Sequence, residues 1–165
     1  MISVPLDRSR HDRQGFDCGV ATLNLYLRQM AGQQARKDNT RTFVLEQAAD
    51  PSRLIGFYTL TMTPIQLDSL PTPLQQRHHG ASSGGLIARL AVDKRFRGQG
   101  YGSWLLVDAL GKLLQASEMV AFPVVIVDAK SGAGEFYHKF GFTPFMDLPD
   151  RLFMTVADIR ASFAD

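Results

Sequence analysis

The chain has 165 residues, of which 45% are hydrophobic and 21% are charged, and its formal net charge is +2. This composition is typical of one globular domain and excludes a disordered or collagen-like chain. The single cysteine, Cys18, excludes an internal disulfide. No apolar run reaches the roughly 20 residues of a membrane span, and the first ten residues lack the apolar core of a secretory signal. We therefore expect one domain over residues 1–165, located in the cytoplasm, with no membrane contact.

Positive charge is concentrated in two blocks of the sequence. Residues 1–41 hold 7 Lys and Arg against 4 acidic residues, and residues 77–100 hold 5 against 1. Two such blocks can meet in the folded chain and bind a polyanion, or they can be solvated surface. Charge alone favours the solvated surface.

The N-terminal part predicts a short strand and a long helix. Residues 2–6 have the pattern of a strand, and Asp17 is a typical N-cap for a helix over residues 18–36. Apolar residues at helical spacing predict one buried stripe on this helix. The stripe consists of Val20, Leu23, Leu27 and Met30.

A hairpin is predicted next. Residues 42–47 and 54–62 are β-type runs, and residues 49–52 between them have turn chemistry. Residues 64–79 carry three prolines and predict short helices and loops.

The second half of the chain predicts a βαβ unit. Strands at residues 86–92 and 124–128 flank a helix over residues 101–115. This order implies parallel pairing at the centre of a sheet, and the second strand is too apolar for a surface position. The expected buried positions of the helix are Leu106, Ala109, Leu110, Leu113 and Leu114.

The remaining elements complete an α/β fold. Ser131 is expected to cap a helix that Gly141 ends, and short strands at residues 142–145 and 152–154 precede helical turns at residues 156–163. One face of the helix after Ser131 is expected to hold Ala133, Phe136 and Phe140. The fold class is α/β, with a single domain built on a mixed central sheet and helices on both faces.

The most informative segment is the run Arg97-Gly98-Gln99-Gly100-Tyr101-Gly102, which follows an apolar strand and opens a helix. Glycines let the backbone turn sharply and approach a ligand. N–H groups at a helix start favour an anion such as a pyrophosphate, to which the arginine can add a charge-assisted bond. A P-loop and a dinucleotide fingerprint are both disfavoured, because no Lys follows the glycines and their spacing differs. A turn without a ligand is the alternative.

This run, as Arg97-x-x-Gly100-x-Gly102, resembles the acyl-CoA signature of GCN5-related N-acetyltransferases (GNAT). Residues 88–100 and 133–142 are similar to the core and to the later helix and strand of that fold. Tyr137 follows Arg97 by 40 residues, a separation that fits the family. The resemblance implies an acetyl-CoA-dependent N-acetyltransferase with a single GNAT-like domain. No metal is expected, because His78 and His79 have no Cys or acidic partner at metal-ligand spacing.

A narrower resemblance covers about residues 5–160. Phe16-Asp17-Cys18-Gly19, the strands that begin at Arg41 and Gly56, and the ending Asp150 to Met154 are similar to GNAT toxins of type II toxin–antitoxin systems. The resemblance implies acetylation of the α-amine of aminoacyl-tRNA and inhibition of translation. It also implies a ribbon-helix-helix antitoxin, binding of the complex to operator DNA as a repressor, and a homodimer. A GNAT that acts on a small-molecule amine or a protein is the alternative.

The family resemblance implies roles for individual residues. Tyr137 is expected beside the coenzyme sulfur, where its phenol can donate a proton to the leaving thiolate; core packing is the alternative. The backbone N–H of Val92 is expected to act as an oxyanion donor. The expected acetyl-CoA contacts are Leu90, Ala91, Val92, Arg97, Gly98, Gln99, Gly100, Tyr101 and Gly102.

The expected substrate chemistry concerns phosphates and an amine. The candidates for tRNA phosphates are Arg36, Lys37, Arg77, Arg89, Lys94 and Arg95. An aminoacyl α-amine ionises no higher than the ~7.7–8.0 of a chain terminus, so it needs no strong base, unlike a lysine at ~10.4. Asp128, at a strand end, is the candidate for a base. Cys18, His78 and His79 are interpreted as structural or surface residues.

Overall fold

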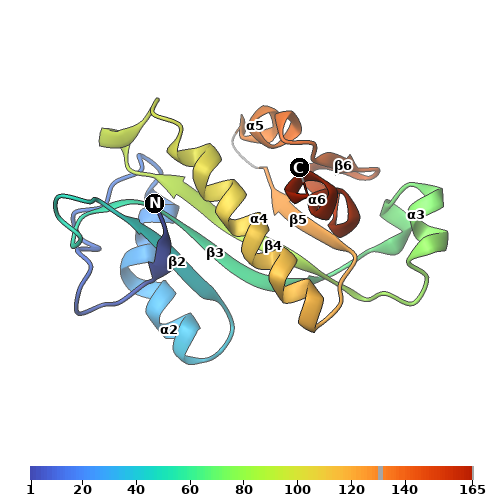
Figure 1. Cartoon of the computed structure of the whole chain (residues 1–165), viewed down its shortest axis with the longest axis horizontal. Coiled ribbons are helices and arrows are strands. Elements are labelled where there is room, and N and C mark those ends of the chain that lie inside the picture. The colour runs from blue at the N-terminus through green and yellow to red at the C-terminus, as the bar shows by residue number, and fades with distance from the viewer. Residues whose placement is uncertain (130–131, 165) are drawn as a thin grey trace. The chain divides into compact units, whose positions relative to one another are not determined.

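The computed structural model describes residues 1–129 and 132–164, and Figure 1 shows its helices and strands. The strands lie in one mixed sheet in the order β1-β2-β3-β4-β5-β7-β6, which confirms the predicted α/β class. Their bounds are β1 Ser3–Pro5, β2 Arg41–Glu46, β3 Leu54–Pro64, β4 Ser83–Val92, β5 Val124–Asp128, β6 Thr143–Phe145 and β7 Leu148–Thr155. The helices are α1 Ala21–Leu25, η1 Tyr26–Met30, α2 Ala31–Arg36, η2 Leu67–Ser69, α3 Thr72–Arg77, η3 Lys94–Phe96, α4 Tyr101–Met119, α5 Gly134–Lys139 and α6 Val156–Phe163.

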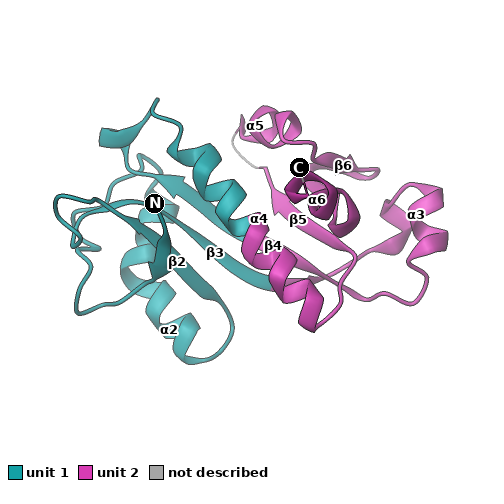
Figure 2. Cartoon of the chain, in the orientation of Figure 1, with its two compact units in different colours: residues 1–61, 88–109 teal, residues 62–87, 110–165 magenta. Residues whose placement is uncertain are grey.

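Two compact units make up the chain, and they are coloured separately in Figure 2. Unit 1 consists of Met1–Thr61 and Ala88–Ala109, and unit 2 of Met62–Ile87 and Leu110–Asp165. Strand β4 and helix α4 each begin in one unit and end in the other. Each unit has its own apolar core.

Unit 1 contains the predicted hairpin. Strands β2 and β3 are antiparallel, with Val44 opposite Phe57 and Phe43 opposite Tyr58. Because side chains alternate along a strand, these two pairs point to opposite faces of the sheet. Val44 and Phe57 pack in one cluster with Leu27, which lies in the N-terminal helical segment.

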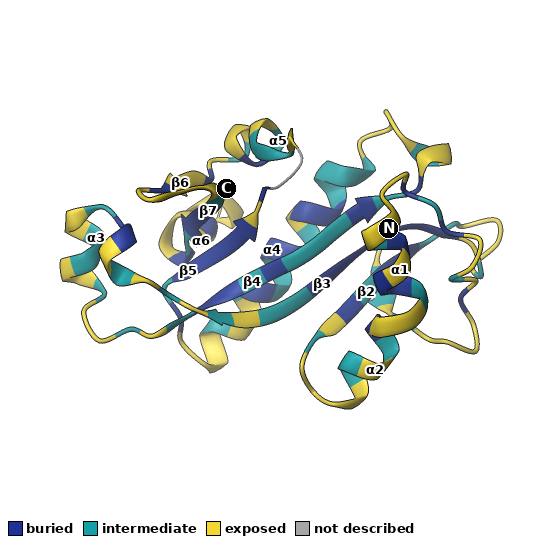
Figure 3. Ribbon diagram, turned by 180° about the vertical axis from the view of Figure 1, so that it is seen from behind, coloured by how far each residue is buried: buried dark blue, intermediate teal, exposed yellow. Residues whose placement is uncertain are grey.

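The other face of unit 1 is covered by the first half of α4. Tyr58 donates a hydrogen bond of 2.6 Å to the carboxylate of Asp108 on that helix. A side-chain carbon at Gly56 would stand only 2.7 Å from Leu105 Cδ1, so this glycine lets the helix approach the strand closely. Helices therefore cover both faces of this part of the sheet, as predicted, and Figure 3 shows the buried strand residues between them.

The N-terminal helix begins later than predicted. Helix α1 starts at Ala21, and Val20 is its N-cap without a side-chain hydrogen bond. The prediction that Asp17 caps this helix is wrong. Its carboxylate instead accepts a 2.8 Å hydrogen bond from the N–H of Gly19, whose positive φ of 83° closes a local turn before the helix.

A wide turn also divides this helix. Residues Tyr26–Met30 form a π-type turn, η1, between α1 and α2, and the N–H of Ala31 bonds to the carbonyl of Tyr26. The turn moves the buried face to Tyr26, Leu27 and Ala31. Val20 and Met30, predicted as part of the buried stripe, are 43% and 42% exposed.

Unit 2 contains the predicted parallel pair. The ladder between β4 and β5 pairs Gly85 with Val125 and Ile87 with Val127, and β7 lies antiparallel on the other edge of β5. Residues Val124 to Val127 have no exposed surface, which agrees with the dark strand β5 in Figure 3. One face of β5 packs with Leu70 and Phe153.

Several element boundaries differ from the predictions. Helix α4 continues to Met119, and β4 and β7 are both longer than expected. On α4, Leu106, Ala109, Leu110 and Leu113 are buried as predicted, whereas Leu114 is half-buried. Gly141 follows α5 with φ +100°, as predicted, and Ser131 lies outside the described residues. No helix in the described part combines the length and the apolar character needed to cross a membrane.

Candidate active site

The glycine-rich loop lies in unit 1, between η3 and α4. Gly98 and Gly100 have φ values of 76° and 84°, a conformation that costs a residue with a Cβ about 1–2 kcal/mol. At both glycines, no atom of the described residues other than the adjacent ones in the chain lies within 4 Å of the position that a Cβ would take. The backbone of the loop is therefore open to a ligand.

The start of α4 adds hydrogen-bond donors to this loop. The helix begins at Tyr101, and its first bond runs over 3.1 Å from the N–H of Trp104 to the carbonyl of Gly100. The N–H groups that precede Trp104 in the first turn have no acceptor within the helix. Together with the helix dipole they favour an anion, and this geometry fits a pyrophosphate.

Strand β4 leads directly into the loop region. Its ladder with β5 ends at Ile87, and the strand continues to Val92 in unit 1. A strand has two hydrogen-bonding edges. From Ala88 to Val92, the edge of β4 on the side of β5 takes no part in the ladder with β5. Ala91 is buried, and Leu90 and Val92 are half-buried. The expected acyl-CoA contacts Leu90 to Val92 and Arg97 to Gly102 thus lie together in unit 1.

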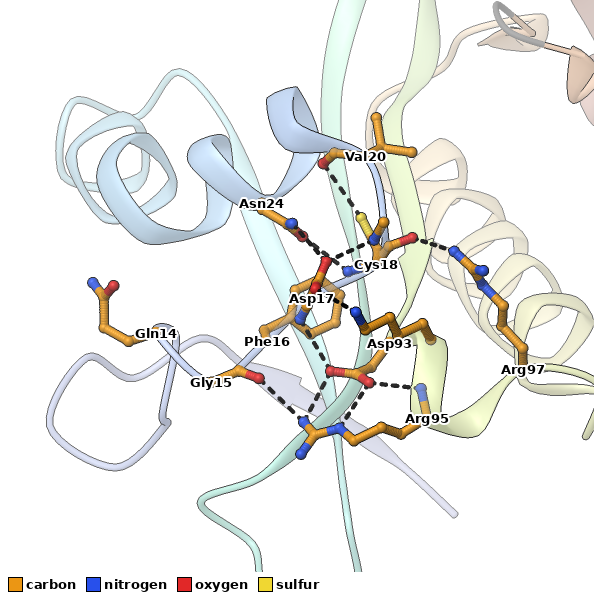
Figure 4. A network of polar contacts seen from close by, with 12 residues as sticks. Gln14, Gly15, Phe16, Asp17, Cys18, Val20, Asn24, Asp93, Arg95 and Arg97 are labelled. Carbon is orange, nitrogen blue, oxygen red and sulfur yellow. Dashed lines mark hydrogen bonds and ion pairs between the residues drawn. The ribbon is translucent and has the colours of Figure 1, made fainter.

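Arg97 is held by the N-terminal segment. Its Nη2 donates a 2.5 Å hydrogen bond to the carbonyl of Cys18, as Figure 4 shows. A side-chain carbon at Gly19 would stand 2.6 Å from that nitrogen, so the glycine leaves room for the guanidinium. One of the five donors of Arg97 is therefore committed to the protein backbone, and an arginine has four further donors for charge-assisted bonds.

Asp93, at the end of β4, is a carboxylate with no exposed surface. Its oxygens accept hydrogen bonds from Nε and Nη2 of Arg95, both 2.9 Å, and from the backbone N–H groups of Arg95 and Asp17 at 2.9 and 3.0 Å (Figure 4). Burial alone would raise the pKa of Asp93, but these donors outweigh it and hold the pKa below its usual value. Asp93 therefore stays ionised and fixes the N-terminal segment beside the loop.

Asp17 extends the same network. Its Oδ1 accepts from the side-chain amide of Asn24 at 3.0 Å, and Asn24 in turn accepts from the N–H of Cys18 at 2.9 Å. Lys94 forms an ion pair of 3.0 Å with the second oxygen of Asp17. The hydrogen bonds from Gly19 and Asn24, followed by the contact with Lys94, hold the pKa of Asp17 well below its usual range. This network is not apparent from the sequence, where its signal is an aspartate directly after an apolar strand.

Tyr137 lies in α5, in unit 2, and is 7% exposed. Its ring makes edge contacts with Phe136 and Phe142, at centroid distances of 5.1 and 5.7 Å. Burial, and then the negative charge of Asp128, raise the pKa of Tyr137 to about 12. The phenol is therefore protonated at neutral pH and can act as a proton donor but not as a base.

The predicted phosphate-contacting residues differ in their surroundings. Lys94 and Arg95 are paired with aspartates, and Arg89 lies 3.6 Å from the ring centroid of Tyr26 in a cation–π contact. Arg36 and Lys37 are exposed at the end of α2 in unit 1. Arg77 is exposed in unit 2. Five of the six predicted phosphate contacts therefore lie in unit 1, and Arg77 is the exception.

Cys18 and Asp128 are the remaining candidates for a nucleophile and a base. Cys18 is buried, and burial raises the pKa of its thiol, which disfavours a nucleophile. Asp128, the predicted base, lies 3.9 Å from Nε of Arg151. Within residues 1–129 and 132–164, no group of three or more His, Cys, Asp or Glu side chains is arranged to hold a metal ion.

Comparison with known families decides the membership of the chain. Residues 38–144 match the family model described as "Acetyltransferase (GNAT) domain". The matched stretch covers more than half of the chain and includes both the glycine-rich loop and Tyr137. The chain belongs to the GNAT acetyltransferase family. The predicted acetyl-CoA-dependent acetyltransferase activity and the GNAT fold are therefore confirmed.

Relatives match almost the whole chain. The "Probable toxin TacT" of Sinorhizobium fredii is 31% identical over 97% of this chain and 93% of its own length. The "tRNA-acetylating toxin" of Mycobacterium tuberculosis is 30% identical over 93% of this chain and 92% of its own length.

Solved structures of similar proteins show the same fold with ligands. AtaT complexed with acetyl-methionyl-tRNAfMet has a TM-score of 0.87 at 28% identity, covering 98% of both chains. AtaTR bound with AcCoA has a TM-score of 0.83 at 27% identity, over 98% of this chain and 96% of the other. The AtaT-AtaR complex bound to DNA has a TM-score of 0.79 at 27% identity, over 99% of each chain.

The loop geometry predicts a specific loss of acetyl-CoA binding. We expect Gly100→Ala to raise the Kd for acetyl-CoA roughly 5–30-fold, because a Cβ at positive φ costs about 1–2 kcal/mol in the conformation that presents the N–H groups. Isothermal titration calorimetry measures the change.

The matched control is Gly80→Ala. Gly80 has φ +90°, and apart from its chain neighbours the described residues place no atom within 4 Å of its Cβ position, but it lies in unit 2, outside the loop. This variant carries the same backbone penalty and is expected to bind acetyl-CoA like the unaltered protein. Unchanged binding in the Gly100 variant would contradict the assigned role of the loop.

The buried carboxylate predicts a pH-dependent loss of stability. We expect Asp93→Asn to lower the free energy of unfolding at pH 7 by roughly 2–4 kcal/mol, because Arg95 loses its charged partner. The loss is limited because the Arg95 side chain is 44% exposed and can be solvated by water. The folded pKa of Asp93 is depressed, so its contribution is present above about pH 4 and is lost as the pH falls further.

Urea titrations at a series of pH values test this prediction. The difference between Asp93→Asn and the unaltered protein is expected to shrink below about pH 4. The control is Asp147→Asn at an exposed position, with an expected change within about 0.5 kcal/mol. A difference that is constant with pH would contradict the role of the ionised carboxylate.

Proposed function

We propose that this protein is the toxin of a type II toxin–antitoxin system. In this proposal it transfers the acetyl group of acetyl-CoA to the α-amine of an aminoacyl-tRNA and so inhibits translation. The observation that carries the proposal is the match over more than nine-tenths of the chain to two proteins named as toxins, one of them tRNA-acetylating. The similar fold of AtaT, solved with acetyl-methionyl-tRNAfMet, supports it.

Holding the donor is assigned to unit 1. The proposal places the pyrophosphate of acetyl-CoA on the N–H groups from Gly98 to Gly102, and the pantetheine arm along the edge of β4 from Leu90 to Val92. Acetyl-CoA supplies the acetyl group as a thioester. The N–H of Val92 is proposed to donate a hydrogen bond to the thioester oxygen as negative charge develops there.

Tyr137 is proposed as the proton donor. The substrate amine forms a bond to the acetyl carbon, the carbon–sulfur bond breaks, and the sulfur takes the proton of the Tyr137 phenol. A phenol with a pKa of about 12 is fully protonated at cellular pH, which suits this role. Structures of KacT and AtaT have been solved with one tyrosine exchanged for phenylalanine. These mutants support a functional role for a tyrosine in the two relatives.

No strong base is needed in this proposal. The α-amine of an aminoacyl ester ionises at or below ~7.7–8.0, so a substantial fraction is neutral at cellular pH. Activity between about pH 6 and 9 then follows the amine, because Tyr137 does not ionise in this range. The proton lost by the attacking nitrogen passes to solvent, and the Tyr137 phenolate takes a proton back from solvent before the next turnover.

The proposal includes partners and location. The related AtaT has been solved with the C-terminus of the antitoxin AtaR, and AtaT-AtaR and KacTA with DNA. We assign to this chain a ribbon-helix-helix antitoxin, an operator bound through the complex, a homodimer, and a cytoplasmic location. Residues 1–165 are assigned to a single N-acetyltransferase domain. Arg36, Lys37, Arg77, Arg89, Lys94 and Arg95 remain predicted tRNA contacts.

An acetyl-transfer assay tests the function. Purified protein is mixed with radiolabelled acetyl-CoA and total charged tRNA, and deacylated tRNA is the control. We expect label on charged tRNA only, and sorting of the labelled species identifies the amino acid. Label on a small amine or a protein, with none on RNA, would favour the alternative GNAT function and overturn the proposal.

Loss of the Tyr137 hydroxyl is expected to affect the chemical step. Tyr137→Phe keeps the aromatic packing, so we expect the Kd for acetyl-CoA to stay within about twofold, while kcat falls roughly 10²–10⁴-fold. Single-turnover kinetics and calorimetry measure the two quantities.

The control variant removes a different phenol. Tyr26→Phe loses a hydrogen bond to Thr40 but keeps the ring under Arg89, and its kcat is expected to be unchanged. Full activity of Tyr137→Phe would contradict the assignment of this residue as the proton donor.

A further inference from the structure

Four arginines of unit 1 line one cavity. Arg8 and Arg13 lie in the segment after β1, Arg28 lies in η1, and Arg36 ends α2. The cavity has a volume of about 300 Å³, and its other lining residues are Gln29, Gly32 and Gln33. We call it the arginine cavity. Of the four, only Arg36 is among the tRNA contacts predicted from the sequence.

Two of the guanidinium groups are fixed by backbone carbonyls. Arg13 donates to the carbonyl of Arg28 at 2.8 Å, and Arg28 donates to the carbonyl of Phe16 at 2.8 Å. Both side chains are half-buried. Because they are already held in place, a ligand bound between them would cost little side-chain entropy.

The other two arginines approach the cavity over a glycine. A side-chain carbon at Gly32 would stand 3.0 Å from Arg8 Cδ and 3.4 Å from Arg36 Nη1. The missing side chain therefore allows both exposed arginines to lie against the surface of α2. The positive charges converge here although they repel one another.

Among the described residues, no carboxylate lies within ion-pair distance of these four arginines. In residues 1–129 and 132–164, none of the four arginines forms an ion pair within 4 Å, whereas Arg10 is paired with Glu46, Arg41 with Asp38 and Arg95 with Asp93. A second, adjoining hollow shares Arg8, Arg13, Gly32 and Arg36 with the cavity and includes Asp7. The Oδ1 of Asp7 accepts hydrogen bonds from the N–H and the hydroxyl of Ser9, at 2.9 and 2.7 Å. Clustered, partly desolvated cations of this kind favour an anionic ligand.

The lining chemistry selects a phosphate. The planar fork of arginine matches the oxygens of a phosphate in pairs, and the amides of Gln29 and Gln33 add neutral hydrogen-bonding groups. None of the lining side chains is aromatic or aliphatic, so the cavity offers neither a surface for base stacking nor an apolar anchor for a peptide. Contact with a nucleic-acid backbone fits these features best.

We infer that the arginine cavity binds a backbone phosphate of the tRNA substrate. The inference rests on the proposed function and deepens it. None of the cavity residues belongs to the glycine-rich loop, so the site holds the RNA independently of acetyl-CoA. Arg8, Arg13 and Arg28 are thereby added to the residues that contact tRNA.

Salt-dependent tRNA binding tests the inference. The variants are Arg8→Gln and Arg36→Gln, since both side chains are exposed and the exchange should leave the fold intact. The control is Arg53→Gln, which removes an exposed positive charge of unit 1 that lines neither this cavity nor the adjoining hollow. Fluorescence anisotropy of labelled tRNA is measured between about 50 and 300 mM salt.

Each cavity variant is expected to lose about one phosphate contact. At 0.15 M salt this corresponds to a roughly fivefold higher Kd, and the slope of log K against log salt falls by about one. The double variant is expected to lose roughly 25-fold. Arg53→Gln is expected to keep both the Kd and the slope, and acetyl-CoA binding is expected to be unchanged in all variants.

The outcomes separate this inference from the proposed function. Failure of the unaltered protein to acetylate any charged tRNA would reject the function. Acetylation by the unaltered protein, with unchanged tRNA affinity and slope in both cavity variants, would overturn the inference alone. If the cavity variants lose binding to inorganic phosphate or to a poly-glutamate peptide but keep their tRNA affinity, the cavity binds another anion. This outcome would also overturn the inference.

Discussion

The burial of the Asp93 carboxylate is the constraint on which unit 1 depends. A charge with no exposed surface is tolerated only where donors replace the lost water, and Asp93 receives four such bonds. One of them comes from the backbone of Asp17, which is 76 residues away in the sequence. The N-terminal segment and the end of β4 are therefore held together by electrostatics as well as by apolar packing. The glycine-rich loop begins shortly after this fixed end of β4.

The positive charge of the chain is used in two different ways. Lys94 and Arg95 are paired with Asp17 and Asp93, so they stabilise the protein's own turn, although each side chain keeps exposed surface that a phosphate can reach. The arginine cavity has no such acid within ion-pair distance among the described residues, and the start of α4 presents N–H groups rather than charged side chains. A count of Lys and Arg in a sequence block cannot distinguish these uses, because the difference depends on where each aspartate lies after folding.

Short-range patterns predicted most of the fold. The hairpin, the buried strand β5 and its parallel pairing with β4 followed from apolar runs, turn residues and the order of the elements. The glycine-rich run from Arg97 to Gly102 also located the loop, because positive φ values select glycine at Gly98 and Gly100.

The failures involve interactions that a local pattern does not contain. Asp17 looked like an N-cap because its side chain suits one, yet the carboxylate bonds to Gly19 and Asn24 before the helix starts. The arginine cavity joins side chains from three segments, and Gly32 matters only because Arg8 crosses it. Such sites arise from tertiary contacts, so residue type and spacing alone do not identify them.

The wide turn η1 determines where this helical segment can vary in length. In a regular α-helix, each inserted residue rotates all later residues by about 100°. A π-type turn holds one additional residue within a single turn, so α2 keeps the orientation of a regular helix one residue shorter. A relative that lacks one residue between Tyr26 and Met30 would therefore still present the counterpart of Arg36 on the same side. A relative that lacks a residue between Gly32 and Arg36 would turn that arginine away from the cavity.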